Sequence, residues 1–143
     1  MSLGGFMSYR LACELEEINS IGSVTGSMAG YYQCNPPKKS SIIHLHGMND
    51  AIVPYNGVEW SFSAKAAHDF WKNHNQCNSQ NEITIPDFNG DGEYTTRLIS
   101  YDCEENKSVE FTNCVELWGN RPKQLSCLLY TSPSPRAHEH SRM

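Results

Sequence analysis

The chain has 143 residues, and its eleven Lys and Arg against sixteen Asp and Glu give a formal net charge of −5. This length suits one domain, and the acidic balance lacks the basic surplus that binds nucleic acid, so we expect no nucleic-acid partner. No stretch approaches the roughly 20 apolar residues that cross a bilayer, so we expect no membrane span.

Two amphipathic helices are predicted along the chain. The first begins almost at the first residue and has an apolar stripe formed by Met7, Leu11, Leu15 and Ile18. The second lies between residues 57 and 77 and has a stripe formed by Trp60, Ala64, Ala67 and Trp71. Spacings of three and four residues place each set on one helical face. We expect the first helix to pack on the sheet through Met7, Leu11 and Leu15.

Short segments rich in Ile and Val predict the strands. Ser20–Val24 and residues 41–45 each end near glycine, as buried parallel strands do. Residues 85–96 ("IPDFNGDGEYTT") are typical of a turn-rich loop, and a further strand is predicted to begin at residues 109–111. This order of helices and strands indicates an α/β fold, a parallel sheet flanked by helices.

The last part of the chain differs in composition. From about Thr112 the hydrophobic periodicity stops, and residues 128–143 ("LLYTSPSPRAHEHSRM") have a Ser, Pro, Arg and His content that builds no core. We therefore expect a domain over residues 1–111 and an irregular, disordered tail over residues 112–143 with a frameshifted or artefactual sequence. Residues 127–143 are excluded from functional reasoning, as a processing scar would be.

The first residues contain most of a nucleophile-elbow pattern. One glycine before Met1 would extend "MSLGG" to G-x-S-x-G-G, which puts a serine on a tight turn between a strand and a helix. Glycines let the backbone segments approach closely, and the helix directs its N-terminal dipole toward a developing oxyanion. The alternative is a flexible chain end, but the amphipathic helix that follows Ser2 favours the elbow.

Five stretches follow one another along the chain: "SLGGFMSYRLACEL", "GSM", "CNPP", "HLHGMNDAIVPYNG" and "FWKNHNQC". Together they resemble the secreted polyhydroxybutyrate depolymerase and feruloyl esterase-like family of α/β-hydrolases, over residues 1–111. In that family the elbow serine is the nucleophile, and the aspartate of an H-G-x-x-D-x-x-V-P-Y stretch is the triad acid. The resemblance implies that Ser2 is the nucleophile, Asp50 the triad acid and the backbone N–H of Leu3 an oxyanion donor.

The position of Asp50 suits this chemistry. Ester hydrolysis needs an activated hydroxyl, a base that takes its proton, and a carboxylate that orients the base. Asp50 follows the predicted strand at residues 41–45, at the end of a parallel sheet where such sites assemble. The alternative is an ordinary turn residue after Gly47. The presence of Ser2 and the chain order of serine before aspartate favour the triad.

The catalytic histidine has no candidate where the family implies one. The family has a G-G-G-H-x-W-P-G loop after the strand that begins at Val109, but residues 111–124 read "FTNCVELWGNRPKQ". The histidines outside the Asp50 stretch are His68 and His74, expected in solvent on the second helix, and His138 and His140, in the tail. The strand that precedes the elbow in the family is also absent. We therefore expect a fragment, the C-terminal part of such a domain, inactive as given.

Two short patterns resemble metal sites. His44 and His46 share one face of a strand, as H-x-H ligands would, but only Asp50 could join them, so histidines packed near an ester site are preferred. Residues 87–93 ("DFNGDGE") follow the order of a calcium loop, but Leu98 stands where the bidentate glutamate belongs, so a polar turn is preferred. We assign no metal and no cofactor.

The six cysteines favour an oxidising compartment, because no C-x-x-C pair suggests zinc. The resemblance implies a disulfide between Cys77 and Cys103, which flank the turn-rich loop. Cys13 and Cys34 remain open as a second pair. We expect a secreted or extracellular protein whose signal peptide lies upstream of the visible N-terminus.

The function predicted from these features is a serine carboxylic ester hydrolase. Its partner would be a polyester, feruloyl or acetyl ester, including polymeric ones. Two other classes stay open: a non-catalytic binding or structural fragment, and a metal-dependent hydrolase centred on His44 and His46.

Overall fold

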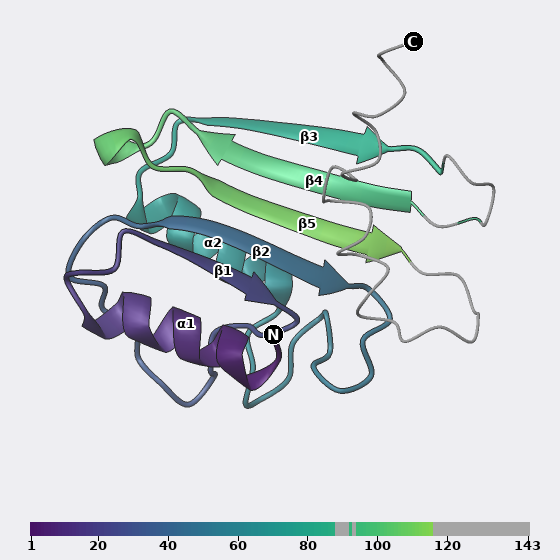
Figure 1. The fold of residues 1–143 in the computed structure, drawn as a ribbon, viewed down its shortest axis with the longest axis horizontal. Helices are drawn as coiled ribbons and strands as arrows, with labels where there is room; N and C mark the ends of the chain where they lie inside the picture. The colour runs from purple at the N-terminus through teal and green to yellow at the C-terminus, as the bar shows by residue number, and fades with distance from the viewer. Residues whose placement is uncertain (88–91, 93, 116–143) are drawn as a thin grey trace, which may run out of the picture.

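The computed structural model describes residues 1–87, 92 and 94–115. Its elements, in chain order, are α1 (Leu3–Glu14), β1 (Ser20–Val24), β2 (Ser41–Gly47), α2 (Ala64–His74), β3 (Ser79–Ile85), β4 (Tyr94–Tyr101), the short 3₁₀ helix η1 (Glu104–Asn106) and β5 (Val109–Val115). The five strands form one sheet in the order β1-β2-β5-β4-β3 (Figure 1).

The sheet is mixed, so the expectation of a parallel sheet flanked by helices is wrong. β1, β2 and β5 run parallel to one another, whereas β4 pairs antiparallel with β5, and β3 pairs antiparallel with β4. The segment between β3 and β4 is too short for the crossover that parallel strands need, so the chain returns as a hairpin. β5 also continues through residues 112–115, where we expected the tail to begin; the rest of that tail lies outside the described residues.

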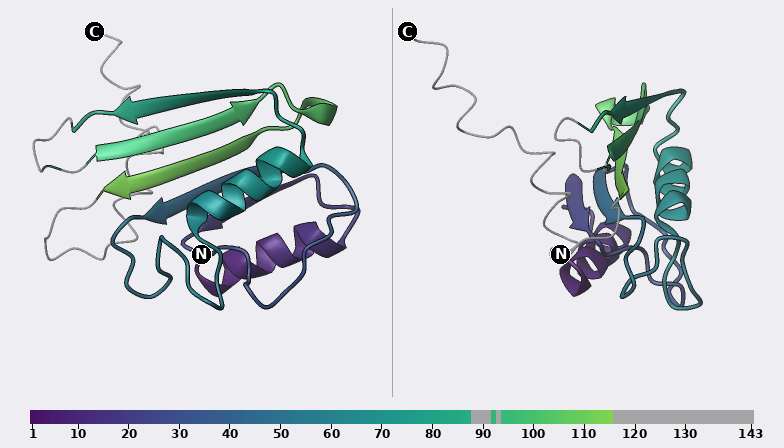
Figure 2. Two further views of the ribbon diagram at one scale, coloured as in Figure 1. Left: turned by 180° about the vertical axis from the view of Figure 1, so that it is seen from behind. Right: turned by 90° about the vertical axis from the view of Figure 1, so that its right-hand side faces the viewer.

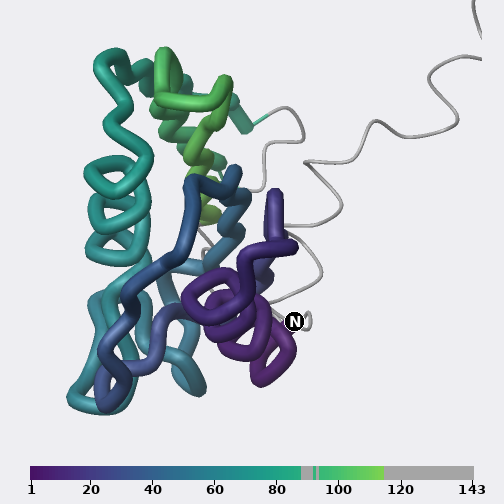
Figure 3. Tube along the Cα trace, turned by 90° about the vertical axis from the view of Figure 1, so that its left-hand side faces the viewer, coloured from purple at the N-terminus to yellow at the C-terminus, as the bar shows by residue number. Residues whose placement is uncertain are grey.

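The two helices share one core with the sheet. α2 lies behind the sheet, across β2 and β5, and α1 runs beside the edge strand β1 (Figures 1 and 2). Figure 3 shows the two helices from the side as separate coils, with α1 at the β1 edge. The buried side chains that join them are Tyr9, Ala12, Cys13, Met28, Ile42, Ala67, Trp71 and Val109.

The predicted stripe of the second helix is largely confirmed. Ala64, Ala67 and Trp71 are each 0% exposed, whereas Trp60 precedes the helix and is 45% exposed. Ser63 caps the helix, because its side-chain oxygen accepts a hydrogen bond from the N–H of Ala66 at 3.0 Å.

The predicted stripe of the first helix does not face the sheet. Met7 is 57% exposed and Leu11 36%, while α1 buries another side, formed by Gly5, Tyr9, Ala12 and Cys13. A Cβ at Gly5 would lie 2.2 Å from the Ser23 Oγ and 2.8 Å from the Gly26 Cα. The close contact of Gly5 with Ser23 and Gly26 therefore decides how α1 is rotated about its axis. Only the face that carries Gly5 can approach the end of β1 so closely.

Two disulfides fasten the described part of the chain. Cys13–Cys34 joins α1 to the connection between β1 and β2. Cys77–Cys103 joins the segment after α2 to the turn after β4. Neither helix has the length and apolar content to cross a membrane.

Candidate active site

Ser2 has a backbone conformation that L-amino acids rarely adopt. Its φ is 50° and its ψ −119°, which is close to the first central position of a type II′ turn, where glycine is preferred. The N–H of Gly4 donates to the carbonyl oxygen of Met1 at 3.0 Å and closes this turn just as α1 begins. A side chain in such a conformation costs about 1–3 kcal/mol, and residues of this kind cluster at active sites.

Close backbone contacts hold the Ser2 turn at the carboxyl end of β1. The N–H of Ser2 donates to the carbonyl oxygen of Val24 at 2.8 Å. A Cβ at Gly26 would lie 2.4 Å from the carbonyl oxygen of Ser2 and 2.6 Å from the Gly5 Cα. Both glycines are therefore required for the approach of the backbone segments, which is the role that glycines have in a nucleophile elbow.

A second strained residue, Thr25, lies at the same edge of the sheet, the one formed by the carboxyl ends of β1 and β2. Thr25 has a φ of 57°, an outlier for a β-branched residue, and its N–H donates to the carbonyl oxygen of Leu45 at 2.8 Å. The hydroxyl oxygens of Thr25 and Ser27 are buried and have no hydrogen-bond partner. Strain and unpaired polar atoms at one edge are features of functional sites.

Asp50 lies in the loop after β2 and presents one unpaired oxygen. Its Oδ1 accepts hydrogen bonds from the N–H groups of Ile52 and Val53 at 2.8 and 2.9 Å. Its Oδ2 is buried without a hydrogen-bond partner; His46 Nε2 is 3.8 Å away, and the Asp50 side chain is 5% exposed. An unpaired buried acceptor costs about 1–3 kcal/mol, and more if it is charged. Oδ2 is the atom to which a base could donate.

The pairing of β1 with β2 brings Ser2 and Asp50 to one edge. Val24 lies beside Leu45 in two parallel strands, so the turn that begins at Ser2 and the loop that holds Asp50 follow the carboxyl ends of neighbouring strands. Segments 20–24 and 41–45, both predicted as strands of a parallel sheet, are thus parallel neighbours. The N–H of Leu3, the first residue of α1, has no acceptor within the helix and is the expected oxyanion donor.

No histidine of the described residues bonds to Asp50 Oδ2 or to Ser2. His44 bonds to Tyr9 and His46, and His46 also bonds to the carbonyl oxygen of Val53. His68 bonds to Ser100 and Asp69. His74 bonds to the carbonyl oxygen of Lys38. His138 and His140 lie outside the described residues. His68, which we expected in solvent, is 1% exposed, because its ring faces β4. Within the described residues, the expected nucleophile Ser2 and the expected acid Asp50 therefore have no histidine hydrogen-bonded to them.

A complete Ser–His–Asp set, called the interior set here after its buried Ser100 and His68, occurs instead between α2 and β4, with Asp69 half-exposed. Ser100 Oγ is 3.2 Å from His68 Nε2, and His68 Nδ1 is 3.3 Å from Asp69 Oδ1. Ser100 is 0% exposed and its backbone is regular β4 strand, so an ester cannot reach its hydroxyl. This set joins α2 to β4 and has a structural role.

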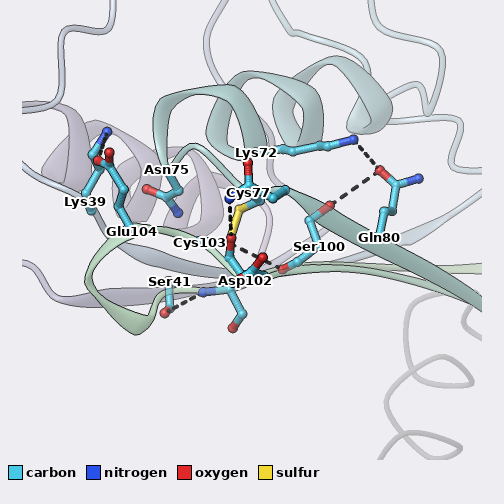
Figure 4. Close-up of a disulfide and its surroundings, with 12 residues drawn as sticks. Lys39, Ser41, Lys72, Asn75, Cys77, Gln80, Ser100, Asp102, Cys103 and Glu104 are labelled. Atoms are coloured by element: carbon cyan, nitrogen blue, oxygen red, sulfur yellow. Dashed lines mark hydrogen bonds and ion pairs between the residues drawn. A yellow bond between two sulfur atoms is a disulfide. The ribbon is translucent and has the colours of Figure 1, made fainter.

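The surroundings of Ser100 support that role. Its hydroxyl also lies 3.5 Å from Gln80 Oε1, which accepts a hydrogen bond from Lys72 at 2.8 Å, and the Cys77–Cys103 disulfide lies close by (Figure 4). These contacts tie the end of α2 to β3 and β4.

Burial keeps the inner histidines neutral. It lowers the pKa of His44 to about 3, with smaller contributions from His46 and His68. Burial also lowers the pKa of His46, opposed by the Val53 carbonyl and the Asp50 charge. The pKa of His68 is lowered for the same reason, and Asp69 opposes the effect. These rings are therefore uncharged at neutral pH.

His44 and His46 do not form an open metal site. Both nitrogens of each ring have hydrogen-bond partners, which are Tyr9, the other ring and the Val53 carbonyl. Within residues 1–87, 92 and 94–115 no group of three His, Cys, Asp or Glu side chains could hold a metal ion. In the calcium-like loop, residues 88–91 and 93 lie outside the described residues, and Leu98 is buried in β4.

One hollow lies away from the candidate site. It has a volume of about 450 Å³ and is lined by Cys34, Asn35, Pro36, Phe70, Asn73 and His74. Asn75, which follows α2, bonds to the backbone of Ser40 before the first residue of β2. The hollow therefore lies near the amino ends of the strands, opposite Ser2 and Asp50.

Tyr9, Thr25 and Gly26 were missed by sequence reasoning. Tyr9 lies outside the apolar stripe of its helix, and threonine is among the residue types least expected at positive φ. For His44 and His46 a signal was available: they alternate along a strand, and this predicted that both rings share one face.

The chain matches no known protein family, and comparisons with curated proteins and with solved structures give no match either. The likeness to depolymerases and feruloyl esterases therefore remains an interpretation of short motifs.

Proposed function

We propose that the chain carries the nucleophile and the acid of a serine carboxylic ester hydrolase. Ser2 is the nucleophile, Asp50 the acid and the N–H of Leu3 an oxyanion donor. One observation carries the proposal: a strained serine turn and a buried carboxylate with an unpaired Oδ2 follow the carboxyl ends of adjacent parallel strands. Neither feature has a purpose in folding alone, because each costs free energy.

The chemistry assigns each group one task. Ser2 Oγ attacks the ester carbonyl while a base takes its proton, and Asp50 Oδ2 accepts the N–H of that base and stabilises its cationic form. The first turn of α1 stabilises the oxyanion through the N–H of Leu3 and the helix dipole. The alcohol then leaves with the proton from the base, and water hydrolyses the acyl-serine.

The substrate class follows from the motif likeness, which supports polyester, feruloyl and acetyl esters, including polymeric ones. The two disulfides support an oxidising, extracellular location. Both assignments are part of the proposal.

Hydrolysis of p-nitrophenyl acetate tests the proposal on this chain. Alone, the chain should be no faster than Ser2→Ala, because a serine without a base stays protonated. Added imidazole supplies the base, so we expect an imidazole-dependent rate, taken throughout as the excess over imidazole without protein, that Ser2→Ala and Asp50→Asn both lose. Ser8→Ala is the matched control, because it removes an exposed hydroxyl from the same helix and should keep the rate.

The outcomes separate the function classes. Equal imidazole-dependent rates for the wild type and Ser2→Ala would overturn the esterase and favour a non-catalytic fragment. A loss in Ser2→Ala with full activity in Asp50→Asn would remove Asp50 from the mechanism.

A further inference from the structure

Three buried side chains form a continuous line of hydrogen bonds beneath the candidate site. Tyr9 Oη is 2.9 Å from His44 Nδ1, and His44 Nε2 is 3.1 Å from His46 Nδ1. His46 Nε2 is 2.8 Å from the carbonyl oxygen of Val53. Tyr9, His44 and His46 are each 1% exposed, so these bonds are shielded from water.

The donors in this line can point in one direction only. The Val53 carbonyl accepts, so His46 must carry its proton on Nε2, and a neutral His46 then accepts at Nδ1. His44 therefore donates from Nε2 and accepts at Nδ1, which makes Tyr9 the donor at the start of the line. The reverse direction would require a second proton on His46, and hence a buried positive charge.

Val53 connects this line to the acid. Its carbonyl accepts from His46, while its own N–H donates to Asp50 Oδ1 at 2.9 Å. At the other end, Tyr9 belongs to α1, the helix that begins directly after Ser2. The line thus runs from the helix of the nucleophile to the loop of the acid.

We propose that Tyr9, His44 and His46 are positioning residues that set the place of the Asp50 carboxylate relative to the helix that begins at Ser2. Their catalytic meaning rests on the proposed esterase function. None of the three touches the substrate. They act through Val53, and they give the acid loop one orientation instead of several.

The packing around the rings supports a fixed geometry. The ring of Phe111 lies edge-on to His44, with centroids 5.6 Å apart, and that of Tyr55 lies edge-on to His46 at 6.0 Å. The ring of Tyr9 also faces that of Trp71 at 6.5 Å. Aromatic contacts of this kind restrict each ring, so the hydrogen bonds need no further ordering.

Nitrogen-15 NMR of the 143-residue chain tests the line directly. We expect His44 and His46 both to be neutral at pH 7 with the proton on Nε2. Tyr9→Phe should shift the ring nitrogens of His44 and the backbone amide of Val53. A proton on Nδ1 of either ring, a charged ring at pH 7 or an unmoved Val53 amide would each overturn the proposal.

Kinetics test the positioning role. Tyr9→Phe should lower the imidazole-dependent kcat about tenfold and leave KM for the ester unchanged, because a small displacement of the acid acts in the transition state. Tyr32→Phe is the matched control: it removes a tyrosine hydroxyl that bonds Glu14 at the far end of the same helix, and it should keep the rate.

The two proposals fail in different ways. If Ser2→Ala loses the rate and Tyr9→Phe keeps it, the positioning role is wrong and the esterase stands. If Ser2→Ala keeps the rate, the esterase is wrong and the positioning role falls with it, whatever the NMR shows of the hydrogen bonds.

Discussion

Two regions of this protein hold a serine and an aspartate, and they differ in almost every other respect. At the edge of the sheet, Ser2 is strained and Asp50 has an unpaired oxygen. Between α2 and β4, the buried Ser100 and His68 form a complete set of hydrogen bonds with the half-exposed Asp69, all in regular secondary structure. By hydrogen bonds alone, the interior set looks like the better triad.

The difference teaches that a complete set of contacts is a sign of stability, whereas strain and an unpaired buried atom are signs of function. A folded chain gains from satisfied polar groups and loses from strained ones. A costly arrangement that persists therefore needs another explanation, and the proposed catalysis would supply one at the sheet edge. Each prediction below acts differently on the two regions.

Acid should have the largest effect. The pKa of His44 is about 3 in the folded chain and about 6.5 when unfolded, so between these values only the unfolded state binds the proton. Stability is therefore full above pH 6.5 and falls by up to about 1.4 kcal/mol per pH unit toward pH 3, of the order of 4–5 kcal/mol in all. Urea unfolding at a series of pH values measures this slope.

Substitution of His44 or His68 shows how much each ring contributes to the loss of stability in acid. His44→Gln should flatten the slope more than His68→Gln, because Asp69 offsets part of the burial effect on His68. Equal slopes in His44→Gln and the wild type would show that His44 does not stay neutral in the folded chain.

Loss of the Cys77–Cys103 disulfide should have the second-largest effect on stability. The closed segment spans 26 residues, for which loop entropy predicts about 3.5 kcal/mol. The double Cys→Ala variant should lose this much free energy of unfolding, while the backbone amides of Asp50 and Ser2 keep their NMR shifts. Large shifts at these two residues would mean that the two regions are not independent.

Ser100→Ala should cost about 1–3 kcal/mol, because it leaves a buried nitrogen of His68 without its partner. Chemical denaturation measures the change, and Ser8→Ala, at an exposed helix position, should stay within about 0.5 kcal/mol of the wild type. A neutral Ser100→Ala would contradict the structural role of the interior set.

Ser2→Gly should have the smallest effect and the opposite sign. Glycine adopts the turn conformation without strain, so the free energy of unfolding should rise by about 1 kcal/mol. The same variant removes the proposed nucleophile and should abolish the imidazole-dependent rate. A destabilised Ser2→Gly would show that the Ser2 side chain supports the fold, and the argument from strain would fail.

Sequence reasoning located three of the five strands and both helices, although it assigned the wrong buried face to the first helix, and it missed the hairpin of β3 and β4. β3 is exposed along most of its length, so it lacks the buried pattern by which the other strands were found. The loop predicted over residues 85–96 was too long, because β3 ends at Ile85 and β4 begins at Tyr94, and residues 88–91 and 93 lie outside the described residues. Without the hairpin, the sheet was expected to be parallel throughout.

For the candidate site, short motifs located Ser2 and Asp50 but nothing that holds them. The line from Tyr9 to His44 joins residues 35 positions apart, and the face of α1 that carries Tyr9 is decided by the contact of Gly5 with Gly26. No local pattern encodes such contacts, because they depend on how distant segments meet.

By itself, the sequence determined what short-range chemistry controls: the glycines beside Ser2, the Val- and Ile-rich strands, the shared face of His44 and His46, and the aspartate that follows their strand. Only the tertiary structure decided the mixed direction of the strands, the rotation of α1, the unpaired Oδ2 of Asp50 and the buried neutral rings beneath it. Propensity and periodicity act within a few residues, whereas burial, strain and hydrogen-bond direction come from contacts across the whole fold.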